Sequence, residues 1–196
     1  MKNDYISIIT PSYNSAEYIE ETIQSVLNQT YEKWELILVD DFSYDNTVSI
    51  IESFISLDSR IKLIKNTENK GAAFTRNTAI SESKYSYLAF LDSDDIWVKE
   101  KLEKQFFFMK SNKIAFSFSG FDIIDKIGNF TGKSVDTSQK GAFSYEDMLL
   151  KKATLGCSTV MLNRSKFNGL MNIPSIRTGQ DYAFWLKLLK NTDEKA

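Results

Sequence analysis

Three carboxylates stand within four positions directly after an apolar run, and no other feature of the chain constrains its fold and ligands as much. The run covers residues 85–91, and Asp92, Asp94 and Asp95 follow it with Ser93 between them. Like charges delivered together at the end of a buried strand repel one another, and a divalent cation would relieve that repulsion. Because the chain has no histidine and one cysteine, the cation would be a hard ion with oxygen ligands, Mg²⁺ or Mn²⁺.

The acidic cluster also indicates the kind of ligand that such a cation would serve. Mg²⁺ usually binds one or two protein carboxylates and completes its shell with water and substrate phosphates. The cluster therefore indicates a phosphorylated ligand. A second acidic pair, Asp40-Asp41, follows the apolar run 34–39 in the same way.

Strand and helix patterns alternate through the first half of the chain. Short apolar runs predict strands at 5–10, 34–39, 61–64 and 85–91, and helical spacing predicts helices near 19–27, 48–55 and 71–80. We expect Pro11 to end the first strand, and Asn14 with Glu17 to cap the first helix. The alternation predicts a three-layer α/β/α sandwich around a mostly parallel, Rossmann-like sheet. Ligands of such sheets bind beyond the carboxyl ends of the strands, where both acidic groups fall.

The pattern changes from about residue 97, which predicts a mixed C-terminal part. Here we expect a helix through residue 109, a strand, turn and strand over 114–131, a short helix opening at 144, a strand at 157–162 and a final helix at 181–190. No internal repeat or linker separates the two halves. The 196 residues therefore predict one domain.

Composition restricts the partners and the compartment. Hydrophobic residues make up 42% of the chain, the formal net charge is −2, and Lys and Arg are scattered, so no nucleic-acid partner is expected. A single cysteine, with no signal peptide and no apolar stretch of about 20 residues, predicts a cytoplasmic protein without a transmembrane segment. Peripheral association with the inner face of the cytoplasmic membrane stays open because of the aromatic run 106–108, which we expect to form the buried face of a helix.

The order of these motifs resembles the family 2 glycosyltransferases. The likeness rests on residues 10–14, 40–43 and 92–95, each after a predicted strand, and extends from residue 7 to about residue 189. It implies the A-type, nucleotide-diphospho-sugar transferase fold. Residues 1–96 would bind the nucleotide sugar and residues 97–196 the acceptor. Relatives in that family usually continue into further helices, so the C-terminus of this chain could be truncated.

The same resemblance implies which residues contact the nucleotide. Pro11, Ser12 and Tyr13 would lie against its base and ribose, and Asp41 would accept a hydrogen bond from uracil. A carboxylate facing the imide N–H of uracil distinguishes it from cytosine, which presents an acceptor there. The alternative for Asp41 is a charge at a helix N-terminus, worth about 0.3–1 kcal/mol. Asp40 would only brace the loop.

Asp92 and Asp94 match the Asp-X-Asp element of the family. The resemblance implies that Asp94 binds Mn²⁺ or Mg²⁺ directly, and that Asp92 and Ser93 contact the nucleotide or the water shell of the metal. Arg76 would bridge the carboxylates and the nucleotide, or else form an ordinary surface ion pair on a helix. Asp95 would be a helix cap. The alternative for the whole element is a solvated acidic turn.

A second acidic motif, usually Glu-Asp in the family, corresponds to Gln180-Asp181. Asp181 matches the general base of inverting members, with a helix cap as the alternative, and Gln180 removes one charge from the usual motif. The reaction leaves negative charge on the departing diphosphate, which a metal stabilises, while a base takes the proton of the attacking hydroxyl. Cys157 lies in a segment that the resemblance places near the acceptor cleft. Without a histidine to activate it, we expect a small buried residue rather than a nucleophile.

These expectations combine into an inverting, metal-dependent glycosyltransferase. It would move a hexosyl or N-acetylhexosaminyl group from a nucleotide-diphospho-sugar, with UDP as the expected nucleotide, to a hydroxyl of a glycan or lipid-linked acceptor, as in bacterial surface polysaccharide synthesis. Neither the sugar nor the acceptor follows from the sequence. Two alternatives stay open: a nucleotide-sugar-binding protein without catalysis, and a receiver-type signalling domain, which is shorter and has no use for Gln180-Asp181.

Overall fold

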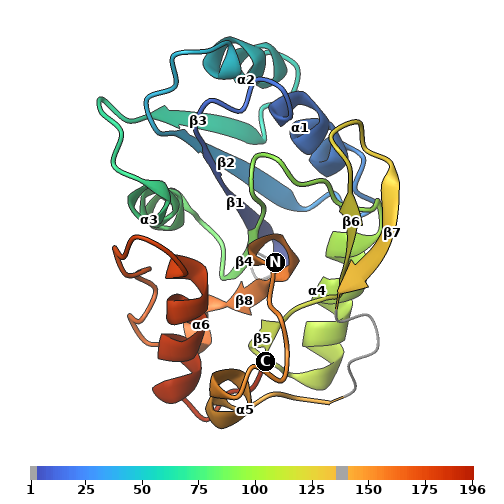
Figure 1. Cartoon of the computed structure of the whole chain (residues 1–196), viewed down its shortest axis with the longest axis vertical. Coiled ribbons are helices and arrows are strands. Elements are labelled where there is room, and N and C mark those ends of the chain that lie inside the picture. The colour runs from blue at the N-terminus through green and yellow to red at the C-terminus, as the bar shows by residue number, and fades with distance from the viewer. Residues whose placement is uncertain (1–3, 136–140) are drawn as a thin grey trace.

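A six-stranded sheet in the order β3-β2-β1-β4-β8-β5 runs through the computed structural model, which describes residues 4–135 and 141–196 (Figure 1). Residues 1–3, which precede the first predicted strand, lie outside the described part. The strands of this sheet are β1 (Ile6–Ser12), β2 (Trp34–Asp40), β3 (Ile61–Lys65), β4 (Tyr87–Phe90), β5 (Phe116–Ser117) and β8 (Met161–Asn163). The first four strands are parallel, whereas β8 is antiparallel to both β4 and β5. The predicted sheet, mostly parallel with a mixed C-terminal part, is confirmed.

Helices cover both faces of the sheet, which gives the predicted three layers (Figure 1). The helices are α1 (Ile19–Leu27), α2 (Thr47–Ile55), α3 (Ala72–Glu82), α4 (Lys101–Asn112), α5 (Tyr145–Leu149) and α6 (Gln180–Lys190). Successive side chains of a strand point to opposite faces, so the core divides into two clusters. Ile8 and Leu36 pack with α1, α2 and α4, while their neighbours Ile9 and Ile37 pack with α3 and α6.

The first strand does not end at Pro11 as expected, but continues to Ser12. Pro11 pairs in register with Val39 of β2. On the side of β1 that faces β2, the Asp41 N–H then donates to the Ser12 carbonyl. The backbone groups of alternate residues point to opposite neighbours, so the missing N–H of Pro11 faces β4. The pairing between β1 and β4 ends before Pro11, since its last hydrogen bond runs from the Leu91 N–H to the Ile9 carbonyl. Proline therefore costs no bond at this position.

Two helix starts also differ from the expectation. Asn14 has φ 48° and caps no helix, since α1 begins at Ile19 without a side-chain cap. Its N–H instead donates to Ser43 Oγ, and its Oδ1 accepts from the Tyr44 N–H, which joins the loops after β1 and β2. The helix expected from residue 97 begins at Lys101. The strand expected at 157–162 is a 3₁₀ turn, η2 (Cys157–Thr159), followed by β8.

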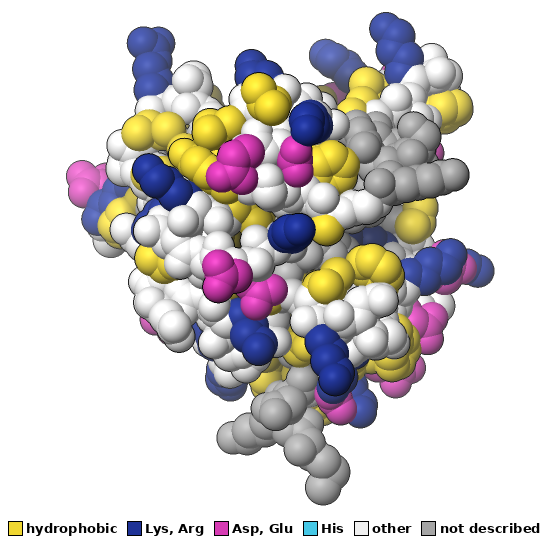
Figure 2. All heavy atoms as spheres, turned by 90° about the horizontal axis from the view of Figure 1, so that it is seen from below, with side chains coloured by type: hydrophobic (Ala, Val, Ile, Leu, Met, Phe, Trp, Pro, Cys, Tyr) yellow, Lys and Arg dark blue, Asp and Glu magenta, His cyan; other side chains and the backbone are white. Residues whose placement is uncertain are grey.

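The surface mixes hydrophobic side chains with charges of both signs. A separate hairpin of β6 (Phe121–Ile124) and β7 (Phe130–Val135) lies beside the sheet and is mostly exposed. In the aromatic run of α4, Phe106 is buried as expected, but Phe107 and Phe108 are 51% and 55% exposed. Figure 2 shows the face seen from below, where Lys and Arg alternate with acidic and hydrophobic side chains. Within residues 4–135 and 141–196, every helix is too short or too polar to span a bilayer.

Candidate active site

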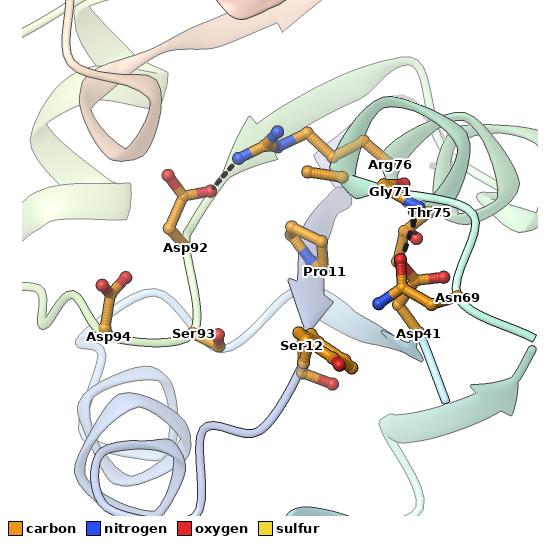
Figure 3. Close-up of a pocket in the computed structure, with 12 residues that line it drawn as sticks. Pro11, Ser12, Asp41, Asn69, Gly71, Thr75, Arg76, Asp92, Ser93 and Asp94 are labelled. Atoms are coloured by element: carbon orange, nitrogen blue, oxygen red, sulfur yellow. Dashed lines mark hydrogen bonds and ion pairs between the residues drawn. The ribbon is translucent and has the colours of Figure 1, made fainter. Parts of the chain in front are cut away.

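A pocket of about 430 Å³ lies at the carboxyl ends of the parallel strands (Figure 3). It is lined by all eight residues that the sequence predicted as nucleotide or metal ligands, namely Pro11, Ser12, Tyr13, Asp41, Arg76, Asp92, Ser93 and Asp94. They come from the end of β1 and the residue after it, from the loop after β2, from α3 and from the turn after β4. The parallel strands deliver their ends to one edge of the sheet, which is why residues so far apart in sequence meet there.

Arg76 and Asp92 form an ion pair at one side of this pocket. Arg76 Nη2 lies 2.6 Å from Asp92 Oδ1, and the two side chains are 11% and 27% exposed (Figure 3). Burial acts to lower the pKa of Arg76, whereas the charge and hydrogen bond of Asp92, with the charge of Asp181, act to raise it. The alternative interpretation of Arg76, an ordinary surface ion pair on a helix, is therefore wrong. The structure instead holds a permanent positive charge inside the pocket wall.

Asp41 organises the opposite side of the pocket. Its buried carboxylate accepts hydrogen bonds from Asn66 Nδ2 at 2.8 Å, from the Lys70 N–H at 2.9 Å and from the Gly71 N–H at 2.7 Å. These bonds fix the loop between β3 and α3, whose Asn69 also lines the pocket. A carboxylate offers about four lone-pair positions, so one acceptor position of Asp41 remains for a ligand.

The backbone conformation at position 71, directly before α3, favours glycine. Its backbone has φ 83° and ψ 160°, a region that residues with a side chain rarely adopt. This conformation turns the Gly71 N–H toward Asp41 and starts α3 at Ala72. Asn69, Gly71, Ala72 and Thr75 line the pocket without having been predicted as ligands. The glycine ahead of the helix was the signal in the sequence for this part of the pocket.

Asp40 braces the loop after β2. The N–H and Oγ of Ser43 donate to its carboxylate at 2.9 and 2.5 Å. Because Ser43 Oγ also accepts the Asn14 N–H, Asp40 supports the connection between the loops after β1 and β2. Its carboxylate is thus used within the protein, as the sequence suggested.

Ser158 of η2 fixes the acidic turn after β4. Its Oγ accepts the Asp92 N–H at 2.9 Å and donates to the Asp95 carboxylate, and its carbonyl accepts Trp97 Nε1 at 2.7 Å. Desolvation, with the charges of Asp92 and Asp94, raises the pKa of Asp95 against the lowering effect of the Ser158 bond. A helix cap is wrong for Asp95, since α4 begins six positions later. Nothing in the sequence near Ser158 signals this contact.

Asp94 has a free carboxylate in the pocket. It is exposed, and in the described part of the chain no hydrogen bond or ion pair engages it. Across residues 4–135 and 141–196, no three His, Cys, Asp or Glu side chains are grouped to hold a metal by themselves. One free carboxylate is the kind of ligand that a hard cation takes from a protein when phosphate oxygens and water complete its shell.

Asp181 lies outside the lining of the pocket, in the first turn of α6. Gly179, with φ 69°, occupies the N-cap position, so the interpretation of Asp181 as a helix cap is wrong. The charge of Asp181 nevertheless acts on Arg76 in the pocket wall, where it helps to raise the pKa of the guanidinium. Burial, followed by the charge of Asp92 and with a contribution from Asp181, raises the pKa of the Cys157 thiol, against the opposing effect of Arg76. Cys157 is therefore a protonated, buried thiol, as expected.

Comparison with known proteins identifies the family. Residues 7–169 match the family described as Glycosyl transferase family 2. The teichuronic acid biosynthesis glycosyltransferase named TuaG, from Bacillus subtilis, is 45% identical over 185 residues, which cover 94% of this chain and 72% of that protein. WfgD from Escherichia coli, named a UDP-Glc:alpha-D-GlcNAc-diphosphoundecaprenol beta-1,3-glucosyltransferase, is 42% identical over 198 residues, covering 99% and 74%.

Solved structures show the same fold. TarS 1–349 of S. aureus in complex with UDP superposes with a TM-score of 0.80 at 24% identity, covering 97% of this chain and 56% of that one. The mannosyltransferase PcManGT from Pyrobaculum calidifontis, in complex with GDP-Man and Mn²⁺, gives a TM-score of 0.72 at 18% identity, covering 96% and 54%. The chain thus spans just over half the length of these transferases, and the predicted A-type fold is confirmed. Its sequence and its fold agree: the chain belongs to glycosyl transferase family 2.

Proposed function

We propose that this family 2 glycosyltransferase moves a sugar, with inversion and with the help of a divalent metal, from a UDP-sugar to a hydroxyl of a lipid-linked glycan. The observation that carries the proposal is the convergence of eight predicted ligands from four separate segments in one pocket. The name of WfgD, which combines UDP-Glc with a diphosphoundecaprenol acceptor, supports both substrates. The UDP complex of TarS supports the nucleotide.

The pocket fits a nucleoside diphosphate as leaving group. Departure of the diphosphate places new negative charge on its oxygens, and Arg76 offers a fixed positive charge that Asp92 holds in place. Asp94 would hold Mn²⁺ or Mg²⁺, which, when bound, stabilises the leaving diphosphate. Replacing Asp94 by Asn should therefore weaken UDP binding in Mn²⁺ strongly. Undiminished UDP affinity in excess chelator would contradict a metal site at Asp94.

Asp41 supports a preference for uracil. Its one remaining acceptor position can take the imide N–H of uracil, whereas cytosine presents an acceptor at that position. Pro11 and Tyr13 line the same pocket and offer surfaces for the ring and the ribose. Calorimetric titration with UDP, GDP and CDP in Mn²⁺ tests this assignment. Tighter binding of GDP would remove the uracil preference and leave the family unchanged.

Asp181 is the residue that we propose as general base. A base acts on the attacking hydroxyl in the transition state, so Asp181→Asn should keep UDP affinity and lower the transfer rate by roughly 10²–10⁴-fold. The acceptor for the assay is a GlcNAc-diphospho-lipid, with radiolabelled UDP-glucose as donor. Glu146→Gln is the matched control, because Glu146 is also an acidic residue in the first turn of a helix. That helix is α5, and Glu146 does not line the pocket. An Asp181→Asn variant that transfers sugar like this control would end the catalytic assignment.

A further inference from the structure

The side-chain amide of Asn77 pairs with the backbone of Ile173 through two hydrogen bonds. Asn77 Nδ2 donates to the Ile173 carbonyl at 2.9 Å, and the Ile173 N–H donates to Asn77 Oδ1 at 2.8 Å. The two residues are 96 positions apart in sequence. A planar amide that makes both bonds fixes the direction as well as the position of the backbone it holds.

Asn77 and Arg76 give α3 two separate attachments. Successive residues of an α-helix point about 100° apart, so neighbours on α3 reach different parts of the protein. Arg76 binds Asp92 in the pocket, and Asn77 binds the segment that leads to α6. Both α3 and α6 pack on the same face of the sheet (Figure 1). The amide of Asn77 therefore connects the pocket helix to the helix that carries Asp181.

Hydrogen bonds from side chains of α3 and α6 hold the segment before α6 in place. Residues 171–176 form no helix or strand, and buried Ile173 packs in the same core cluster as α6. Besides Asn77, Lys187 Nζ of α6 donates to the Asn172 carbonyl at 3.0 Å. Gln180 Nε2 donates to the Ile176 carbonyl at 2.8 Å. An ionised Glu could not donate that last bond, which gives a physical reason for Gln180 in this chain.

We propose that Asn77 is a positioning residue: by holding Ile173 it fixes the first turn of α6, and with it Asp181, relative to the Arg76–Asp92 pocket. The inference rests on the proposed function of Asp181 as base. Displacing a catalytic group by about 1 Å can lower a rate by roughly 10²-fold. Loss of the Asn77 contact should therefore lower turnover without affecting the binding of the nucleotide.

The test compares Asn77→Ala with Arg164→Met. Arg164 holds the other end of α3, donating to the carbonyls of Ile80 and Ser83 at 3.2 and 2.9 Å, and among the described residues none of its side-chain hydrogen bonds reaches the segment before α6. Both variants should melt at lower temperature and bind UDP like the wild type. Only Asn77→Ala should lower kcat for transfer, by roughly 10- to 100-fold, with the donor KM nearly unchanged. Asn77→Asp, which sets a carboxylate oxygen against the Ile173 carbonyl, should reproduce this loss.

Hydrogen exchange gives a second measurement that does not depend on activity. Amides 173–181 should exchange faster in Asn77→Ala than in Arg164→Met. If the wild type transfers sugar, equal kcat values for the two variants overturn the inference. If the wild type transfers none, the proposed function fails, and unchanged exchange at 173–181 still overturns the role of Asn77 in holding the segment.

Discussion

Lys101 should destabilise the protein at neutral pH, and replacing it should be stabilising. It is the first residue of α4, is 8% exposed, and its Nζ has no hydrogen-bond partner within the described residues. The ammonium lies over the ring of Trp97, whose centre is 3.8 Å away. Desolvation lowers the pKa of Lys101 from 10.5 to about 7. We therefore predict that Lys101→Met raises the free energy of unfolding.

The size of the gain follows from the two pKa values. The pKa of Lys101 falls from 10.5 in the unfolded chain to about 7 in the folded protein. This difference lowers the free energy of unfolding by at most about 5 kcal/mol. Loss of the contact with Trp97 offsets about 1–2 kcal/mol. The expected gain is about 2–4 kcal/mol at pH 7, which corresponds to a rise in Tm of about 4–16 °C for a chain of this length.

The pH dependence gives the sharper test. Between about pH 7 and 10.5 the unfolded chain binds one more proton than the folded one, so the stability of the wild type rises with pH in that window. The advantage of Lys101→Met should shrink by up to about 1.4 kcal/mol per pH unit there and stay level below pH 7. Urea unfolding followed by tryptophan fluorescence measures it, with Lys104→Met on the exposed side of α4 as control. A gain independent of pH, or a loss at pH 7, would refute the reasoning.

Three further predictions concern the pocket and the residues packed beside it. Asp92→Ala should lower the free energy of unfolding by about 3 kcal/mol, because it leaves the buried Arg76 guanidinium unpaired. Arg76→Met should lower it by less, because the Asp92 carboxylate that it leaves is partly exposed. Equal losses in urea unfolding would contradict this asymmetry. Gly71→Ala should cost about 1–3 kcal/mol and weaken UDP binding, although its Cβ would meet no atom within 4 Å, because only the backbone conformation opposes it. Cys157 should react with a thiol reagent at pH 7 only on unfolding, and rapid labelling of the native protein would show that the thiol is not buried.

The sequence alone predicted the parallel half of the fold and the acidic groups of the pocket. Apolar runs such as 34–39 and 85–91 are local signals, because a strand buried on both faces needs apolar residues throughout. Polar residues directly after such runs must meet at one edge once the strands are parallel. Asp41, Asp92 and Asp94 could therefore be placed together without coordinates. The resemblance to the family added Pro11, Ser12, Tyr13, Ser93 and Arg76, and the structure shows all five at the same pocket.

Tertiary contacts decided the features that no local window contains. Asn14 carries the pattern of a helix cap, but its backbone and amide bind the loop after β2 instead. Pro11 carries the signal of a strand end, yet β1 continues because the proline faces a neighbour that has already stopped pairing.

The partners of Ser158 and Asn77 likewise lie 66 and 96 residues away. Hydrogen bonds of this kind depend on which backbone groups the packed sheet and helices leave open. A strand or helix pattern is set by neighbours within a few residues, whereas the support of the acidic turn and of the first turn of α6 exists only after the two halves of the chain have packed together.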